Sequence, residues 1–155
     1  MIPLLYTDSD KVMATIGLTP DDLPDSFFEA KDFIRTLSVD LYIWLPTHSS
    51  VFIPPGSVPS TDKLGFESDC LVLYCSYFLA SRTAESVLAI MVKESDGQSE
   101  YDRFSGLDLQ KLTGDMANRA AYYRQTLLSS LQSDNVVTST SKARAVSPSY
   151  DPVTG

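Results

Sequence analysis

Residues 71–80 read Leu-Val-Leu-Tyr-Cys-Ser-Tyr-Phe-Leu-Ala, the longest apolar run in the chain. The preceding residues from Thr61 include several charged side chains. The sequence therefore predicts a helix over about 61–80 that is exposed at its start and apolar on all sides towards its end. A helix that is apolar on all sides lies at the centre of a bundle. Periodicity alone leaves a second interpretation open, a buried strand over about 71–77.

Two further stretches have helical spacing. One runs from about Pro24 to Leu45 and ends at Pro46, and the other runs from about Asp108 to Leu131. Their apolar positions are Phe27, Ala30, Ile34, Leu37, Leu41 and Trp44 in the first, and Leu109, Leu112, Met116, Ala120, Tyr123, Leu127 and Leu131 in the second. Spacings of three and four residues place each set on one face of a helix. Because glycine inside a helix costs about 1 kcal/mol relative to alanine, we expect Gly114 to lie at a close helix crossing.

Shorter helices are predicted elsewhere in the chain. A helix over about 7–17 is expected to be capped by Thr7 or Asp8, since their side-chain oxygens can accept the first free backbone N–H groups. Gly17 suits the position just past its end. Another helix is expected to begin near Thr83.

The stretch that follows Thr83 gives the one hairpin signal. Asp96-Gly97 is a strong turn pair and predicts a small β-hairpin over about 92–104. The sequence thus predicts a mainly α fold, a small helical bundle with a β-hairpin and an extended C-terminal tail. The helical domain is expected over residues 1–132 and the tail over residues 133–155.

The predicted tail is rich in serine and threonine and contains Pro148 and Pro152. It cannot bury enough apolar surface to offset a backbone ordering cost of roughly 1–2 kcal/mol per residue. We therefore expect it to gain its shape by docking on another molecule; the alternative is that it lies across its own domain. The tail residues expected to contact a partner are Lys142, Arg144, Val146, Tyr150 and Val153.

Composition limits the class of function. The 155 residues carry a formal net charge of −8, which argues against a nucleic-acid-binding surface, although an acidic wall can surround DNA without gripping it. We expect no secretory signal, and the longest apolar run falls well short of the ~20 residues of a membrane-spanning helix. Cys70 and Cys75, in a helix, would have their Cα atoms roughly 8–9 Å apart, too far for a disulfide. Both are therefore expected to be reduced thiols, packed in the core of a protein from a cytoplasmic-type compartment.

Patterns of catalysis and metal binding are sparse. His48 is the one histidine, and Ser49 and Ser50 beside it have the residue types of a nucleophilic site without evidence of its geometry. Neither a zinc pattern nor a glycine-rich phosphate loop occurs. The acids at 21–25 are expected to cap a helix rather than hold a metal. We therefore expect a solvated loop histidine, no catalytic residue, no cofactor, no metal and no enzyme activity.

Two short stretches are candidate partner contacts. Val51, Phe52 and Ile53 lie in a long Pro-rich loop over 47–60, which favours an exposed contact patch; equally, Phe52 can tuck into its own core. In Tyr122-Tyr123-Arg124 one tyrosine belongs to the core stripe. Tyrosine and arginine are enriched at interface anchors, so Tyr122 and Arg124 are expected contacts, against the alternative of an ordinary amphipathic surface.

The order of these elements resembles that of the head–tail connector adaptors of tailed bacteriophages over most of residues 8–132. The resemblance rests on the Phe27 to Leu45 helix, the Pro-ended loop, the apolar Leu71 to Ala80 helix, the Val92 to Gly97 stretch with its return strand, and the closing helix and tail. It implies a structural virion protein, assembled in the bacterial host cytoplasm, that forms a ring, usually twelve-fold, beneath the portal protein.

The resemblance also implies the partners. These are other copies of the chain, the portal protein, and a stopper or tail component, while DNA passes through the ring without specific binding and no membrane is involved. A rival reading is a small cytoplasmic helical regulator or assembly chaperone that binds one protein partner through the same apolar surfaces.

Overall fold

The computed structural model describes residues 3–19, 21–30, 32–94 and 106–134. Within them the chain is mainly helical with one small two-stranded hairpin, which confirms the expected fold class. The elements in chain order are β1 (Pro3–Leu4), β2 (Thr7–Asp8), α1 (Ser9–Thr15), α2 (Asp25–Ala30), α3 (Phe33–Trp44), α4 (His48–Val51), α5 (Asp62–Glu94) and α6 (Gly106–Asp134).

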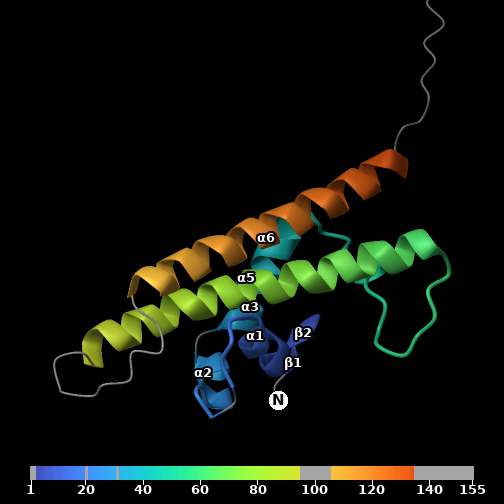
Figure 1. Cartoon of the computed structure of the whole chain (residues 1–155). Coiled ribbons are helices and arrows are strands. Elements are labelled where there is room, and N and C mark those ends of the chain that lie inside the picture. The colour runs from blue at the N-terminus through green and yellow to red at the C-terminus, as the bar shows by residue number, and fades with distance from the viewer. Residues whose placement is uncertain (1–2, 20, 31, 95–105, 135–155) are drawn as a thin grey trace, which may run out of the picture.

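Helices α5 and α6 form the long axis of the molecule and pack against each other (Figure 1). Ser130, near the end of α6, donates a hydrogen bond of 2.7 Å to Glu67, near the start of α5. Further along, Arg119 of α6 donates to the Tyr77 hydroxyl of α5 at 3.3 Å. Because the partners occur in opposite order along the two helices, the pair is antiparallel.

Helix α5 is the central element. It contacts α6 and, away from α6, the elements β2, α1, α3 and α4 (Figure 1). Leu71, Cys75 and Leu79 are completely buried. The prediction of a central apolar helix is confirmed, and the alternative of a strand over 71–77 is not what the chain adopts.

Helix α5 is longer than the sequence predicts. The expected end at Ala80 and the new start near Thr83 are both wrong, because one helix runs from Asp62 to Glu94. Thr83 is buried and its hydroxyl donates to the carbonyl oxygen of Leu79 at 2.8 Å. A threonine that bonds to the preceding turn in this way sits inside a helix and does not cap one.

The observed hairpin lies near the N-terminus and not at the predicted position. Val92–Glu94 belong to α5, so the hairpin predicted over 92–104 is wrong there, and residues 95–104 lie outside the described residues. The observed hairpin pairs β1 with β2 in antiparallel register, Pro3 opposite Asp8 and Leu4 opposite Thr7. Its turn places Leu5 at φ +63°, a left-handed conformation for which leucine gives no sequence signal.

The helix predicted over 24–45 is two helices, α2 and α3. Between them Asp32 adopts a left-handed φ of +54°. The break lets three aromatic rings, Phe27, Phe28 and Phe33, gather with their centroids 5.4–5.7 Å apart. Ile34, expected on the core face with Leu37 and Leu41, is 45% exposed, and Phe33 is buried beside those two residues in its place.

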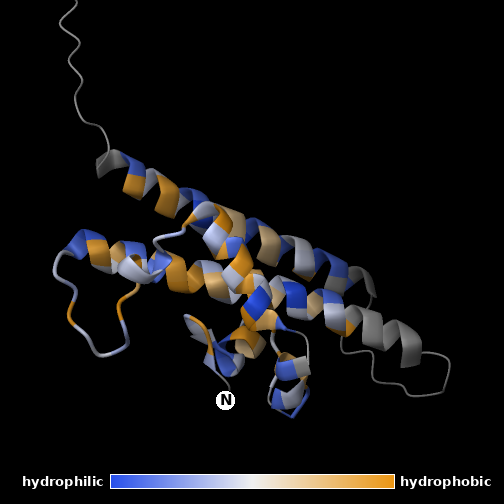
Figure 2. Cartoon of the chain, turned by 180° about the vertical axis from the view of Figure 1, so that it is seen from behind, coloured by the Kyte–Doolittle hydropathy of each residue, from blue (hydrophilic) through white to orange (hydrophobic). Residues whose placement is uncertain are grey.

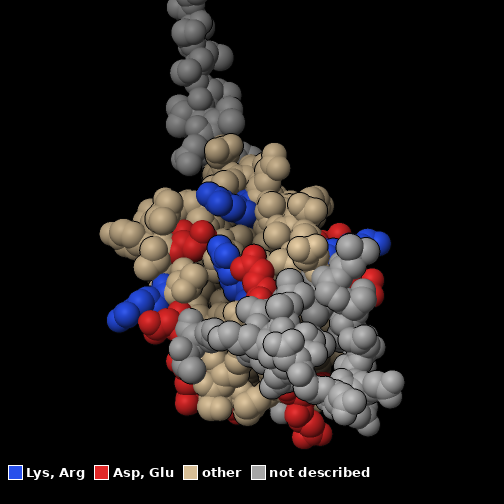
Figure 3. Space-filling view, turned by 90° about the vertical axis from the view of Figure 1, so that its left-hand side faces the viewer, with Lys and Arg blue, Asp and Glu red and all other residues tan. Residues whose placement is uncertain are grey.

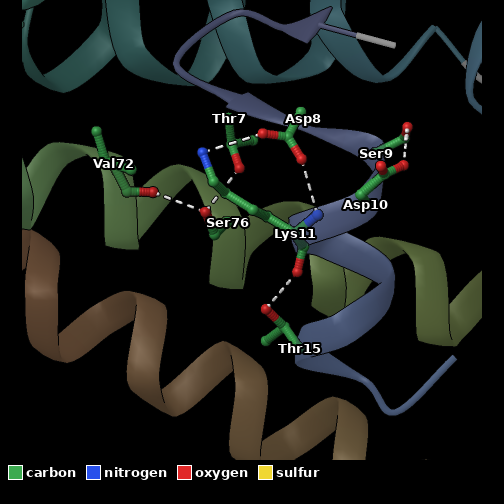
Figure 4. Close-up of polar contacts among 8 residues, drawn as sticks. All are labelled: Thr7, Asp8, Ser9, Asp10, Lys11, Thr15, Val72 and Ser76. Atoms are coloured by element: carbon green, nitrogen blue, oxygen red, sulfur yellow. Dashed lines mark hydrogen bonds and ion pairs between the residues drawn. The ribbon is translucent and has the colours of Figure 1, made fainter. Parts of the chain in front are cut away.

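A buried hydrogen bond joins β2 to α5 (Figure 4). Asp8 caps α1 as expected: its carboxylate accepts a hydrogen bond of 2.8 Å from the Lys11 backbone N–H. The buried Thr7 and Ser76 hydroxyls are hydrogen-bonded at 2.8 Å, and Ser76 also donates to the Val72 carbonyl oxygen. Gly17 follows α1 with φ +74°, which confirms its predicted place just past the helix end.

Helix α6 confirms the predicted stripe of core residues, since Met116, Ala120 and Leu127 are buried. The expected close crossing at Gly114 is wrong, because a Cβ added there would meet nothing within 4 Å. Ser133 and Asp134, assigned to the tail, still belong to α6.

Candidate functional site

Helix α3 has two apolar faces, and only one of them is covered. Phe33, Leu37 and Leu41 are buried in the core. On the opposite side Val39, Tyr42 and Ile43 follow at spacings of three and four, and their exposed fractions are 56%, 71% and 76%. We call these three residues the outer α3 face. The helix lies on the near side of α5 in Figure 2, so this face points away from the bundle.

A basic side chain borders the outer α3 face. Arg35 lies four positions before Val39 and seven before Tyr42, on the same side of the helix. Its guanidinium is 3.5 Å from the Asp32 carboxylate, and both side chains are at least 70% exposed. An exposed pair of this kind contributes about 0–1 kcal/mol, so Arg35 can exchange Asp32 for another acid at little cost.

Elsewhere the surface charge is mixed. On the end of the molecule drawn in Figure 3, acidic and basic side chains lie beside one another on the described residues. The net charge is therefore not gathered into one acidic field on that end.

Contiguous exposed apolar residues have a functional meaning. Monomeric proteins rarely expose such groups together, and where they do the patch commonly binds another protein. The buried face of α3 already anchors this helix to its own core. The outer α3 face is therefore the strongest candidate for an interaction site among the described residues.

A groove of about 360 Å³ lies between α3, α5 and α6. At its edge Asp40 accepts hydrogen bonds from the Trp44 indole N–H, at 2.9 Å, and from the Tyr74 hydroxyl. The Arg124 guanidinium lies 5.1 Å from the centroid of the Trp44 ring. The residues lining the groove are Asp40, Tyr74, Phe78, Ser81, Arg82, Glu85, Ala117, Ala120, Ala121, Arg124, Gln125 and Leu128.

This cluster fastens α3 to the two long helices. Burial, with the neighbouring Asp40 carboxylate as a further cause, raises the pKa of the Tyr74 hydroxyl. The hydroxyl therefore stays protonated and donates to Asp40 at neutral pH. The chemistry is that of a structural hydrogen-bond network and supplies no nucleophile.

The raised pKa values predict alkaline instability. Burial also raises the pKa of the Cys75 thiol, with Asp40 adding to the effect. From ordinary values of 10.0 for Tyr74 and 9.0 for Cys75, each group loses its proton more readily in the unfolded chain than in the folded one. Their stabilisation is complete below about pH 9 and is lost as the pH rises towards the folded-state values.

We expect the free energy of unfolding to fall by on the order of 1 kcal/mol per pH unit above about pH 10. Urea unfolding at about pH 8 and pH 11 measures it. Tyr74→Phe, which keeps the ring and removes the hydroxyl, should flatten the decline. An identical decline in that variant would contradict the role given to Tyr74.

The predicted exposed patch at Val51, Phe52 and Ile53 is not exposed as expected. Val51 is only 5% exposed and belongs to the core, so it is not available to a partner. The Phe52 ring packs on Tyr6, with centroids 4.4 Å apart, and the Ile53 N–H donates to the Ser68 hydroxyl at 2.9 Å. The loop after α4 folds back onto α5, and the alternative in which Phe52 tucks into its own core is what the structure has.

The Tyr122-Tyr123-Arg124 stretch divides between two sides of α6. Tyr123 is partly buried against the core, as expected for the stripe residue, and Tyr122 is 65% exposed. Arg124 instead lies over Trp44 at the groove. The five tail residues expected to contact a partner, Lys142, Arg144, Val146, Tyr150 and Val153, lie outside the described residues.

The weaker chemical candidates are used structurally. His48 is half-buried in α4 and its Nδ1 is hydrogen-bonded to the Tyr6 hydroxyl at 2.5 Å, so the expectation of a solvated loop histidine is wrong. Ser50 donates to the Thr47 carbonyl oxygen at 2.7 Å. Asp22 accepts from the Thr19 N–H at 2.8 Å, a local turn contact. No group of three His, Cys, Asp or Glu side chains placed to hold a metal occurs in the part of the chain that the structure describes.

Both cysteines are free and buried, as expected for packed thiols. The sequence reading missed the outer α3 face. The sequence does contain a signal for this second face, because positions 39, 42 and 43 have helical spacing. The apolar stripe on the opposite side was already sufficient to predict the helix.

Comparisons with protein-family models, with curated proteins and with solved structures found no match to this chain. Among the described residues, no helix combines the length and the apolar character needed to cross a bilayer.

Proposed function

We propose that the protein is a non-catalytic structural subunit that assembles with copies of itself into a closed ring, and that this ring is the head–tail adaptor of a tailed bacteriophage. The observation that carries the proposal is the outer α3 face, an apolar helix surface that the subunit leaves uncovered. In this function the ring lies in the virion between the portal protein and a stopper or tail component, and the tail of the chain docks on the portal.

The size of the outer α3 face favours a ring over a simple pair. Covering Val39, Tyr42 and Ile43 contributes roughly 3–6 kcal/mol in total. Association of two proteins costs an estimated ~4–15 kcal/mol in lost freedom of motion. One such contact alone is therefore weak. A closed ring gives every subunit two contacts and leaves no free end.

The net negative charge of the chain supports a channel through which DNA passes without being bound. A formal net charge of −8 repels the phosphate backbone, so DNA can move through a ring of such subunits without adhering to it. The order of the helices gives further support through the resemblance to the adaptors. The hairpin on which that resemblance partly rests is not supported at Val92–Glu94, so the assembly test carries the greater weight.

The test is the mass of the full chain in solution. Sedimentation velocity should show a discrete large species at micromolar concentration, and Tyr42→Asp/Ile43→Asp should sediment as a monomer with an unchanged helical circular dichroism spectrum. The control is Val58→Asp, which introduces one aspartate at an apolar side chain that is 91% exposed in the loop before α5. It should assemble normally.

Three results would count against the proposal. A wild-type chain that stays monomeric at all concentrations rejects self-assembly, and binding of one unrelated protein by that monomer would favour the regulator or assembly chaperone. Assembly that survives in Tyr42→Asp/Ile43→Asp rejects the role of the outer α3 face. Rings that never co-sediment with phage portal rings reject the neck adaptor while leaving the assembly in place.

A further inference from the structure

A second apolar surface lies on the two long helices. Phe66 and Leu73 of α5 are 51% and 37% exposed, and their spacing of seven residues places them on one side of the helix. Tyr77 follows four residues later on that side and stacks on Tyr123 of α6, with ring centroids 5.6 Å apart and planes 6° apart. Tyr122 packs edge-on against Tyr123 at 5.3 Å. We call these five residues the α5–α6 face.

The two apolar surfaces lie on different sides of the molecule. Tyr74 and Phe78 lie on the side of α5 that faces α3, since the Tyr74 ring is 4.9 Å from Trp44 and both line the groove beside Asp40. At about 100° per residue, Phe66 and Leu73 lie roughly a quarter to two-fifths of a turn around α5 from Tyr74 and Phe78. In Figures 1 and 2, α3 lies on one side of the α5–α6 pair.

This arrangement decides between two kinds of contact. In a two-fold contact centred on one of the two surfaces, that surface pairs with its own copy, and the other, on a different side of the molecule, remains in water. In a head-to-tail contact the outer α3 face of one subunit covers the α5–α6 face of the next, and both surfaces are buried by a single repeated interface. The head-to-tail contact is the one that leaves neither surface exposed.

Charge complementarity points to the same contact. Arg35 borders the outer α3 face. Asp69 is exposed on α5, three positions after Phe66 and four before Leu73, and no ion pair joins it to another described residue. A head-to-tail contact can bring an arginine of one subunit to an acid of the next. A contact of the outer α3 face with itself would instead bring two copies of Arg35 together.

We infer that the outer α3 face of one subunit docks on the α5–α6 face of a second copy of the chain. This inference rests on the proposed self-assembly and names the two surfaces that meet. It assigns Tyr122, together with Phe66 and Leu73, to the receiving side. It leaves Arg124 outside the contact, fixed on Trp44 at the groove.

Complementation between two assembly-defective variants tests the inference. Tyr42→Asp/Ile43→Asp lacks only the donating surface, and Phe66→Asp/Leu73→Asp lacks only the receiving surface. Each alone should be monomeric. At concentrations well above those at which the wild type assembles, an equimolar mixture should form a heterodimer of twice the monomer mass and nothing larger, because one intact surface of each kind remains and a single contact is weak. Native mass spectrometry with one variant isotope-labelled identifies the heterodimer.

The failures are distinguishable. A monomeric wild type rejects the proposed function and this inference together. If the wild type assembles but Phe66→Asp/Leu73→Asp also assembles alone, the outer α3 face pairs with itself and the inference is wrong. A mixture that remains monomeric at these high concentrations rejects it as well, provided that both variants keep the wild-type circular dichroism spectrum.

A charge exchange repeats the test with milder substitutions, in case an aspartate variant fails to fold. Both positions are exposed, so folding is little affected. Arg35→Glu should weaken assembly about 5- to 10-fold, and adding Asp69→Lys to the same chain should restore it, since each subunit meets the other charge across the contact. Equal weakening in the single and double variants would overturn the pairing of these surfaces.

Discussion

Leu71→Ala is expected to lower the free energy of unfolding by about 3–4 kcal/mol. Leu71 lies on the central helix α5 and is completely buried. The substitution removes the transfer free energy of the lost methyl and methylene groups and leaves a cavity that packed neighbours on several elements can only partly close. Because domains of this size are stable by roughly 5–15 kcal/mol, the loss is a large fraction of the total.

Urea unfolding followed by circular dichroism measures this loss. It is best done in the Tyr42→Asp/Ile43→Asp background, in which assembly should not contribute to stability. Leu73→Ala is the matched control, since it makes the same change two positions away on α5 at a side chain that is 37% exposed. It should cost about 1 kcal/mol or less. Equal losses at Leu71 and Leu73 would contradict a central position for α5.

Asp40→Ala is expected to cost about 2–3 kcal/mol, more than a half-exposed surface acid normally does. Its carboxylate accepts from Trp44 and from Tyr74, and Tyr74 is only 3% exposed. Hydrogen bonds to a charged group contribute about 1.5–3 kcal/mol, and removal of the acceptor leaves the buried Tyr74 hydroxyl and the partly buried Trp44 N–H without it. The expected consequence is a loosening of α3 from the long helices, read as a lower urea midpoint.

A double-mutant cycle separates this network from loss of packing. Tyr74→Phe removes one donor, so in the Tyr74→Phe background Asp40→Ala should cost at least about 1 kcal/mol less than in the wild type. Asp40→Asn keeps an acceptor oxygen and should be the milder change. Additive effects of Asp40→Ala and Tyr74→Phe would show that the two side chains do not act together.

The long helices could be predicted because their signals are local and repeated many times. The cap at Asp8 and the turn at Gly17 follow equally from residue type. Features that depend on contacts distant in sequence could not be predicted. Asp32 breaks the expected second helix with a left-handed backbone, and Phe27, Phe28 and Phe33 on either side of the break pack on one another. Thr83 has the residue type of a helix start, but its hydroxyl bonds within α5.

The candidate site was predictable only in part. Tyr122 was expected to face outward, and it does. Phe52 could not be assigned, since a loop aromatic fits a partner and a core equally well, and its contact with Tyr6 joins residues far apart in the chain. The outer α3 face was overlooked because a helix that satisfies one apolar stripe gives no local reason to examine the other side.

The two buried thiols of α5, Cys70 and Cys75, can report how often the folded chain opens. Burial raises the pKa of Cys70 and of Cys75, and only the deprotonated sulfur attacks an alkylating reagent. Alkylation therefore requires a transient unfolding around α5 that exposes the thiols to solvent. The rate at which the chain gains mass in iodoacetamide then times those openings in the native protein, with no added dye or engineered label.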